Sequence, residues 1–378
     1  MKIIPYGDLT FPDVAALSRD IPVLIPIGQD SYDLERAAHA LRSDSLVLLP
    51  AIPYGSVRRD GLGALAVGQA LWRRVLQGVQ RELKAQEFRR VWFLSDQAGP
   101  RGRGANAPRF LRGRLASHVN GARAWTWPTD LAGRVVVVST GHTEQHGLHL
   151  PLDTDTRIVE AIAQGVGVAA PERALCLPAW PYGVSTHTRQ YPGTLNLGGR
   201  TFEDFFLAVV GRLIGLGARA ILFSNGHGGN HSFLVNVVKW AGERWPHAFV
   251  AMEFLHTTGP ALEAFRDSAR GGMGHGCELE TSYLLHLRPH AVHMERARPE
   301  VDFISTPNYY MDWIEGGRLI ANPPWSDDTQ TGVYGDPTLA SAEKGRRWLA
   351  AAVEEKLQSL AEIQEQVRRR EERRRERS

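Results

Sequence analysis

Apolar positions in the middle of the chain alternate between strand-like and helix-like patterns. Residues 135–139 (VVVVS) form a continuous β-branched run, which is typical of a strand buried on both faces. Shorter apolar runs predict three more strands, at 174–177, 220–224 and 248–254. Because helical patterns separate these runs, the sequence predicts an α/β fold whose mostly parallel sheet is covered by helices on both sides. Ligand sites in such folds lie at the carboxyl ends of the strands.

The predicted helices repeat their apolar residues every three or four positions. One such stripe runs from Thr201 to Leu216, where Thr201 and Asp204 are spaced like a capping box and Gly217 is expected to end the helix. Further helices are predicted at 232–244, at 278–287 and from 340 to about 366.

The first hundred residues resemble a shortened copy of the middle of the chain. Three pairs of segments correspond in order: 21–28 with 135–141, 48–56 with 176–185, and 91–95 with 220–224. The second pair shares the motif P-A-x-P-Y-G, which is too particular for ordinary strand–helix composition. The sequence therefore predicts an internal duplication.

Composition narrows the class of protein. The chain has 378 residues, of which 43% are hydrophobic, so it can form a core and a wholly disordered chain is excluded. Its two cysteines, Cys176 and Cys277, exclude a disulfide scaffold and lead us to expect a cytoplasmic protein. We expect neither a signal peptide nor a membrane span, because no apolar stretch approaches the ~20 residues that a spanning helix needs.

The net charge of +3 comes from one short segment. The last eleven residues hold seven Arg and three Glu, and the remainder has one more acidic than basic side chain. Because Glu is interleaved and no aromatic residue is present for base stacking, this segment is predicted to be a solvated helix end rather than an RNA-binding arm. Nucleic acid and membranes are therefore not expected partners.

A first polar cluster, 141–155 (GHTEQHGLHLPLDTD), directly follows the most apolar strand. It contains Glu144, His146 and Asp155. Oxygen and imidazole ligands without a thiolate suit Zn, Mn or Fe in a hydrolytic centre, and a carboxylate such as Asp155 can bridge two ions. Glu144 and His146 either point into one site or straddle two.

Two further clusters lie after a strand and at the head of a helix. They are 225–231 (NGHGGNH), with His227, and 274–282 (GHGCELETS), with His275 and Glu280. Either one alone is also compatible with a Gly-rich turn or a capped helix start. Because each of the three clusters lies at the end of a strand or the start of a helix, we expect them to meet in one site.

Together these motifs resemble the creatininase (creatinine amidohydrolase) family. The likeness extends to YPGTLNL at 191–197 and GDPTLASAEKG at 335–345, and it covers about residues 125–350. It implies a three-layer α/β/α sandwich, two divalent metal ions per chain (Zn, Mn or Fe) and a homo-oligomer. Two bound ions would lower the pKa of a water toward neutrality, so no Ser or Cys nucleophile is required.

The resemblance also implies roles for individual residues. The metal ligands would be Glu144, His146, Asp155, His227 and Glu280. Asp155 would bridge the two ions. Creatininase carries a metal-binding Glu at the position of Gly229, and here Glu280 would replace it. Glu280 is also a predicted catalytic residue. His275 would donate a proton to the leaving nitrogen.

Substrate contacts are predicted for His142, Trp180, His187, Gly228 and Asn230. His142 stands where the family usually has Ser, so it either contacts the substrate or caps its loop. The family's loop histidine falls at Thr188, with His187 one residue earlier. Trp180, Trp313 and Trp325 could line a pocket or belong to the core.

These inferences predict a hydrolase that cleaves the C–N amide bond of a small molecule, such as a cyclic amide or a formamide. One alternative is a peptidase that trims a short peptide or a peptide-derived cofactor precursor. A second is a non-catalytic scaffold or maturation protein that keeps the metal site for stability.

Four regions are predicted. Residues 1–100 form a creatininase-like pseudo-domain, 101–124 a connector, 125–366 the catalytic domain and 367–378 a charged tail. The pseudo-domain is expected to lack the metal centre, because Ser31, Asp33 and Ala98 occupy the positions of Glu144, His146 and His227. It is expected to pack on the catalytic half, in place of a contact between subunits of single-domain relatives.

Overall fold

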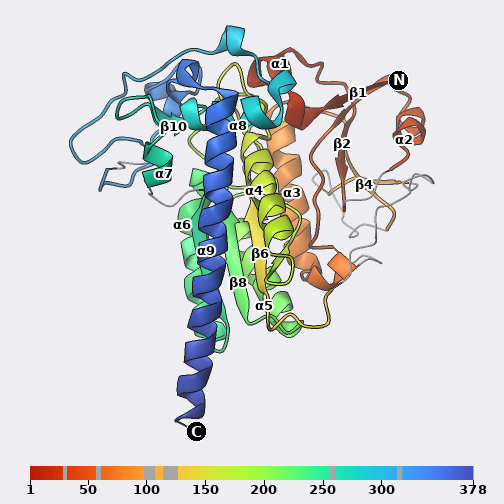
Figure 1. The fold of residues 1–378 in the computed structure, drawn as a ribbon. Coiled ribbons are helices and arrows are strands. Elements are labelled where there is room, and N and C mark those ends of the chain that lie inside the picture. The colour runs from red at the N-terminus through yellow and green to blue at the C-terminus, as the bar shows by residue number, and fades with distance from the viewer. Residues whose placement is uncertain are drawn as a thin grey trace.

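Two parallel sheets, one from each half of the chain, form the molecule (Figure 1). The structure, a computed structural model, describes residues 1–28, 32–56, 61–97, 107–113, 127–255, 260–312 and 317–377. Ser31, Ala98 and Trp313 lie outside these ranges, as does most of the predicted connector. We call residues 1–113 the N-terminal half and residues 127–377 the C-terminal half.

The C-terminal half contains a four-stranded parallel sheet in the order β7-β6-β8-β9. Its strands are β6 (Val135–Thr140), β7 (Ala174–Cys176), β8 (Ala220–Asn225) and β9 (Phe249–Phe254). All four strands that the sequence predicts are therefore present.

Helices cover both faces of this sheet. Val135 and Val137 of β6 share a core with α4 (Thr154–Ala169) and α9 (Ala342–Arg375). The alternate residues Val136 and Val138 face the opposite side, with α5 (Gly199–Gly215) and α6 (His231–Arg244). This alternation along a doubly buried strand confirms the predicted three-layer α/β/α arrangement.

The N-terminal half contains a five-stranded parallel sheet in the order β1-β3-β2-β4-β5. Its strands are β1 (Lys2–Pro5), β2 (Val23–Pro26), β3 (Ser45–Leu48), β4 (Val91–Ser95) and β5 (Phe110–Arg112). The order β3-β2-β4-β5 repeats β7-β6-β8-β9. Strand β5 lies in the predicted connector and pairs with β4, so the N-terminal sheet extends beyond the predicted boundary at residue 100.

Equivalent backbone hydrogen bonds recur in the two halves. Gly28 N donates to Ile52 O at 2.7 Å, and Gly141 N donates to Trp180 O at 2.9 Å. The helices α3 (Gln69–Ala85) and α5 each contain 17 residues and precede the strands β4 and β8. After each helix comes a residue with positive φ, Glu87 at 68° and Gly217 at 104°. The two halves thus share one topology over these elements.

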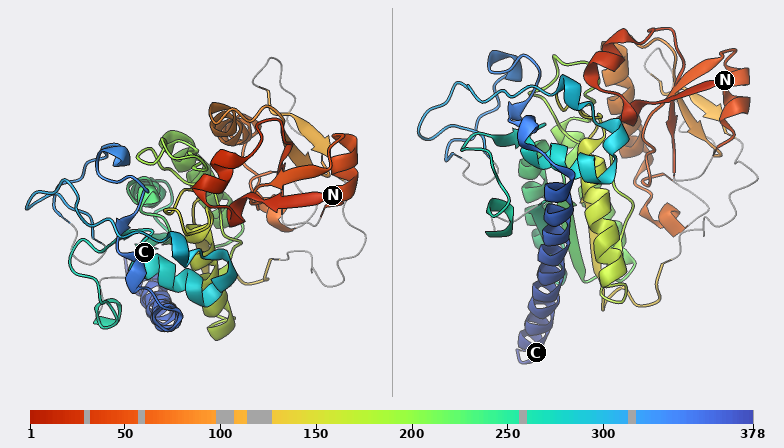
Figure 2. Two further views of the ribbon diagram at one scale, coloured as in Figure 1. Left: turned by 90° about the horizontal axis from the view of Figure 1, so that it is seen from above. Right: turned by 45° about the horizontal axis from the view of Figure 1, so that its top comes forward.

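The two halves also share one apolar core. Helix α3 lies between the two sheets and packs on α5 (Figures 1 and 2). The two P-A-x-P-Y-G motifs meet there, with the rings of Tyr54 and Trp180 5.4 Å apart and the rings of Trp180 and Phe205 4.2 Å apart. Helix α2 (Leu34–Ala40) covers the outer face of the N-terminal sheet.

The remaining elements are short and lie mostly at the carboxyl edge of the second sheet. They are α1 (Phe11–Ala16), α7 (Pro260–Glu263), β10 (Met273–His275), α8 (Glu278–Leu287) and β11 (Tyr334–Gly335), the last pairing antiparallel with β10. Short 3₁₀ helices occupy Tyr6–Asp8, Gly61–Leu65, Gly228–Asn230, Pro289–Ala291, Met294–Arg296, Trp325–Asp327 and Pro337–Leu339. Within the part of the chain that the structure describes, no helix combines the length and apolarity needed to cross a membrane.

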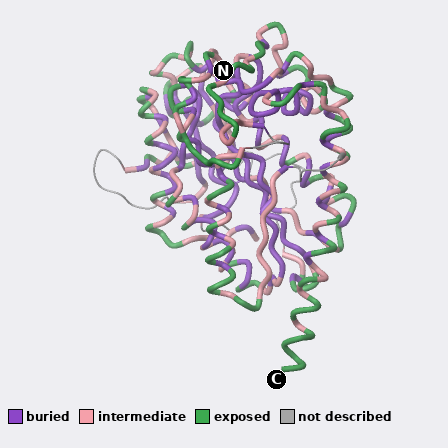
Figure 3. Tube along the Cα trace, turned by 90° about the vertical axis from the view of Figure 1, so that its left-hand side faces the viewer, coloured by how far each residue is buried: buried purple, intermediate pink, exposed green. Residues whose placement is uncertain are grey.

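One predicted helix end needs correction. Helix α5 begins at Gly199, with Gly198 as its N-cap at φ 87°, so Thr201 lies inside the first turn and does not cap the helix. Helix α9 continues to Arg375, so the charged segment is a helix end, as predicted, and Arg368 and Arg369 both pair with Glu365 one turn away. Its last turns extend beyond the body of the molecule and are exposed (Figure 3).

The equivalent tyrosines of the two P-A-x-P-Y-G motifs allow a matched test of the shared core. The Tyr182 hydroxyl donates to Pro50 O, whereas the Tyr54 hydroxyl is buried and has no hydrogen-bond partner among the described residues. We expect Tyr182→Phe to lower the free energy of unfolding by about 1 kcal/mol, since it removes the donor to the partly buried Pro50 carbonyl. Tyr54→Phe should change it by less than about 0.5 kcal/mol or stabilise the protein. Urea denaturation measures both, and equal losses would contradict this account.

Candidate metal centre

Six side chains converge at the carboxyl edge of the second sheet. Glu144 and His146 lie in the loop after β6, Asp155 is the second residue of α4, and His227 follows β8. His275 ends β10, and Glu280 lies in the first turn of α8. All six are buried, with at most 4% of any residue exposed. The structure therefore brings the three sequence clusters together, because parallel strands end at one edge.

Asp155 lies between two imidazoles. Its Oδ1 is 3.0 Å from His146 Nε2 and its Oδ2 is 3.1 Å from His227 Nδ1. Glu144 Oε1 lies 2.9 Å from His227 Nδ1, and Glu280 Oε1 lies 3.8 Å from His146 Nε2. Asp155 thus joins the contacts around His227 to those around His146. Ligand atoms of Glu144, His146 and His275 also lie within 4.8 Å of one another.

Backbone carbonyls determine which nitrogen of each histidine is free. His146 Nδ1 donates to Glu144 O at 3.1 Å, His227 Nε2 to Val184 O at 3.0 Å, and His275 Nε2 to Gln145 O at 2.7 Å. A carbonyl oxygen only accepts, so these nitrogens carry the protons. In the neutral ring, the opposite nitrogen faces the carboxylates with a lone pair, as in histidines that ligate metals.

His142 has the opposite arrangement. Its Nδ1 accepts a hydrogen bond from Gly183 N at 2.8 Å, so the proton of the neutral ring is on Nε2. Burial lowers the pKa of His142 to about 3, which keeps the ring neutral. Although its ring centroid lies 4.5 Å from that of His227, His142 therefore presents no lone pair to an ion. It holds the loop after β7, and its side chain does not line the cavity described below.

The ionisable groups of the site differ in how their surroundings shift their pKa values. Burial opposes ionisation of Asp155, but the His146 and His227 imidazoles lower its pKa to about 2. Burial also disfavours charge on His146, yet Asp155 and Glu280 raise its pKa to about 9. Burial raises the pKa of Glu280 to about 7 and lowers that of His275 to about 3, so His275 is a neutral base.

The donor set fits divalent ions. His227 Nδ1, Glu144 Oε1 and Asp155 Oδ2 are all acceptors when His227 is neutral, and they face one another without a hydrogen between them. Glu144 Oε1 and Asp155 Oδ2 have no hydrogen-bond donor among the described residues. Buried acceptors in contact require a proton or a cation, and carboxylate and imidazole together suit Zn or Mn.

The other predicted substrate contacts divide into two groups. His187 and Gly228 line the cavity over the cluster. Trp180 is fully buried in the core shared with Tyr54, and Asn230 is buried, where it accepts from Val184 N at 3.0 Å and donates to Gly141 O at 3.2 Å. The structure therefore places Trp180 and Asn230 in supporting positions, away from the cavity lining.

Gly229 cannot carry the glutamate of creatininase in this backbone. A Cβ atom there would lie 2.2 Å from Val184 O and 2.5 Å from His227 Nε2. Real Cβ contacts are essentially never this short, so any side chain at 229 would displace the loop or the His227 ring. Glu280 approaches His146 from α8 instead.

A cavity of about 400 Å³ opens onto the cluster. Its walls are mainly apolar and include Phe233, Tyr309, Met311, Ile320 and Trp325. The Trp325 ring lies 4.4 Å from that of His187 and 4.9 Å from that of His275. Sequence reasoning missed the lining residues between 309 and 322, because this loop has no apolar period and no motif that marks it.

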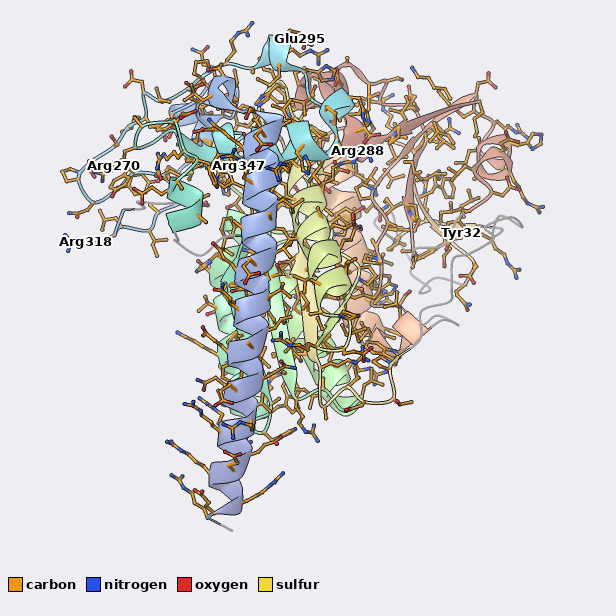
Figure 4. The ribbon with its side chains drawn as sticks, viewed as in Figure 1. Tyr32, Arg270, Arg288, Glu295, Arg318 and Arg347 are labelled. Atoms are coloured by element: carbon orange, nitrogen blue, oxygen red, sulfur yellow. The ribbon has the colours of Figure 1, made fainter. Side chains whose placement is uncertain are left out.

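Outer loops enclose the cavity on one side. Arg270 and Arg318, labelled in Figure 4, lie on these loops, where the Arg270 guanidinium stacks 3.7 Å over the Tyr310 ring. Thr188 Oγ1 donates to Glu144 Oε2 at 3.2 Å. Thr188, which stands in place of the loop histidine, therefore holds the carboxylate of Glu144.

Fold and site together define an α/β/α protein with a buried carboxylate–imidazole centre at the carboxyl edge of a parallel sheet. The sequence profile of the creatininase family, described as creatinine amidohydrolase, matches residues 123–360. The chain belongs to this family and is a creatininase-family hydrolase, which confirms the resemblance read from the motifs. The match begins after β5, so the N-terminal sheet precedes it.

The relatives that match this chain align with it over most of their own length. The mycofactocin precursor peptide peptidase of Mycobacterium tuberculosis (strain CDC 1551 / Oshkosh) is 35% identical over 234 residues, covering 60% of this chain and 84% of the relative. The creatinine amidohydrolase of Pseudomonas putida is 25% identical over 241 residues, covering 58% and 86%. A crystal structure of creatininase superposes with a TM-score of 0.52 at 23% identity, covering 61% and 90%, and supports the fold alone.

Metal binding should release protons. His146, with a pKa of about 9, carries a proton at pH 7 and must lose it to ligate an ion. The apparent affinity for Zn²⁺ should therefore rise about tenfold per pH unit for each proton released, from pH 6 to pH 8. Calorimetry in buffers of different ionisation enthalpy counts these protons. A binding heat that does not depend on the buffer would contradict this assignment.

Proposed function

We propose that this creatininase-family hydrolase uses two divalent ions to cleave an amide C–N bond in a peptide substrate. The observation that carries the proposal is that Asp155 joins the contacts around His227 to those around His146 at the floor of a cavity of about 400 Å³. That volume is in the range that holds a drug-sized ligand. Solved creatininase structures carry manganese or zinc, which supports either metal here.

Glu144 and His227 would hold one ion, and His146 and Glu280 the other, with Asp155 shared. Ions bound there would lower the pKa of a water and polarise the amide carbonyl. Thr188 and the carbonyls of Glu144 and Val184 fix the orientation of the ligands. The buried setting excludes bulk water and strengthens every charge interaction at the reacting bond.

His275 would carry the proton between the two steps. It lines the cavity, it is neutral, and its Nδ1 lone pair lies 3.9 Å from Glu144 Oε1. The proton released as water attacks the carbonyl carbon would move to His275 Nδ1. From there it would pass to the leaving nitrogen as the C–N bond breaks, so the ring ends neutral.

Two observations favour the peptide over a small cyclic amide or formamide. Relatives at 35% identity are named mycofactocin precursor peptide peptidase, whereas the creatinine amidohydrolase relative is 25% identical. The glutamate that creatininase carries near the metals is also excluded at Gly229. None of the described residues that line the cavity is Lys or Arg, so the walls suit uncharged, apolar side chains.

Glu144 should be indispensable to the centre. We expect the wild type to bind close to two divalent ions per chain. Glu144→Gln should lower metal occupancy and reduce kcat/KM by about 100-fold or more. Glu243→Gln, on the exposed face of α6, is the matched control and should change neither. Elemental analysis of the purified protein and a panel of amide substrates measure both, and a wild type with fewer than one ion per chain would sink the proposal.

Substrate preference tests the peptide assignment separately. Peptides with aromatic or aliphatic side chains beside the scissile bond should be cleaved with a higher kcat/KM than peptides with Asp or Glu there. Trp325→Ala should raise KM for the apolar peptides by about tenfold. It removes apolar surface that the substrate side chain buries, and this burial contributes at least about 1.4 kcal/mol to binding. Faster cleavage of creatinine or formamides than of any peptide would favour the small-amide alternative.

A further inference from the structure

We propose that the N-terminal half, whose described residues contribute no ligand group to the metal clusters, holds the metal-binding loops of the C-terminal half in place, and that Gln86 is its positioning residue. The inference rests on the proposed function, since it assigns a role toward the same metal centre. It concerns two contacts between the halves. One reaches the loop at Gly193 and Thr194, and the other ends at Leu152 and Asp153, next to Asp155.

Gln86 binds the main chain of the C-terminal half in two directions. It follows the last residue of α3, and its Oε1 accepts from Gly193 N at 2.8 Å while its Nε2 donates to Thr194 O at 3.0 Å. The Tyr6 hydroxyl adds a third hydrogen bond, to Gly193 O at 3.3 Å. One planar amide thus binds two peptide groups of this loop, the one before Gly193 and the one after Thr194.

The fixed loop is hydrogen-bonded directly to the metal ligands' own loop. Gln145 N, between Glu144 and His146, donates to Thr194 Oγ1 at 3.2 Å. Leu195 N donates to Thr143 O at 3.0 Å, on the other side of Glu144. Displacement of residues 193–195 would therefore shift Glu144 and His146 together.

A second contact supports Asp155. Leu152 N donates to Leu9 O at 2.9 Å, and Asp153 N donates to Gly7 O at 3.3 Å. The backbone at Gly7 approaches Asp153 closely, since a Cβ atom there would lie 2.4 Å from Asp153 Oδ2 and the Asp153 side chain would have to move. Charged side chains reinforce this contact, since Arg157 pairs with Asp8 of the N-terminal half and with Asp153.

Arg288 extends the same contact from the end of α8. Its guanidinium lies 3.6 Å from Asp8, on the side of the molecule that faces the N-terminal half (Figure 4). Both side chains of this ion pair are partly exposed, so the pair contributes little to stability. The backbone hydrogen bonds to Leu9 and Gly7 are therefore the main support of the Asp155 loop.

The role of Gln86 belongs to the N-terminal copy alone. Its equivalent at the end of α5, one residue before the positive-φ position, is Leu216, which is 38% exposed. The glutamine is thus not a general requirement for ending this helix. In the N-terminal half, this position instead contacts the loop of the other half.

Amide hydrogen exchange tests the contact without metal or substrate. Gln86→Leu should increase exchange at residues 143–146 and 193–195 at least tenfold, with α9 unchanged. Gln86→Glu keeps the acceptor for Gly193 N and should show a smaller increase. Gln77→Leu, half-buried on the same helix, is the control and should behave as wild type. An increase spread evenly over the chain, or none in either Gln86 variant, overturns the proposal.

Metal affinity supplies the second readout. Competition with a chromophoric chelator should show Zn²⁺ bound about tenfold more weakly by Gln86→Leu than by Gln77→Leu, as for other residues that orient metal ligands. With a cleavable substrate, kcat should fall more than KM rises. Unchanged affinity in Gln86→Leu overturns the proposal, whereas a wild type that binds no metal overturns the proposed function and leaves the exchange result to decide the contact.

Discussion

The structure depends on mutually repelling acceptor atoms that are held together in a buried site. His227 Nδ1 lies 2.9 Å from Glu144 Oε1 and 3.1 Å from Asp155 Oδ2, and none of these residues is more than 4% exposed. Burying carboxylates in this way costs several kcal/mol per charge unless a proton or cation compensates. Protonated His146 and His227 supply that compensation in the free protein, and divalent ions would replace those protons. Every loop around the cluster therefore has to resist the ligands' tendency to separate.

The sequence predicted which side chains converge, because each of them follows a feature with a strong pattern. Glu144 and His227 come directly after doubly buried strands, and Glu280 lies in the first turn of a helix whose bounds, 278–287, were predicted correctly. Because parallel strands end at one edge of a sheet, predicting the strands also predicted where these side chains meet. Trp180 could not be assigned in this way, because an aromatic residue after a strand packs equally well into a core or against a ligand. Only its neighbours Tyr54 and Phe205 show that it belongs to the core.

Features without a periodic apolar pattern could not be predicted from the sequence. The cavity walls at Tyr309, Met311 and Ile320 come from an irregular loop, and β5 is only three residues long in a Gly- and Arg-rich stretch. The role of His142 likewise depended on a tautomer, which Gly183 N fixes from 41 residues away in the chain. A histidine near a metal centre and a histidine that ligates a metal look alike in sequence and differ in which nitrogen the backbone occupies.

The shared core explains why the N-terminal half bears on the chemistry of the other. Helices α3 and α5 pack back to back between the two sheets, so the N-terminal half contributes apolar surface to the layer from which Gln86 reaches the loop at 193–194. A flexible tether between two separate domains would allow that loop to move relative to α3. A continuous, close-packed core does not, because displacement would open voids in it. The face that the N-terminal half packs against α5 therefore limits how far the loop at 193–194 can move relative to α3.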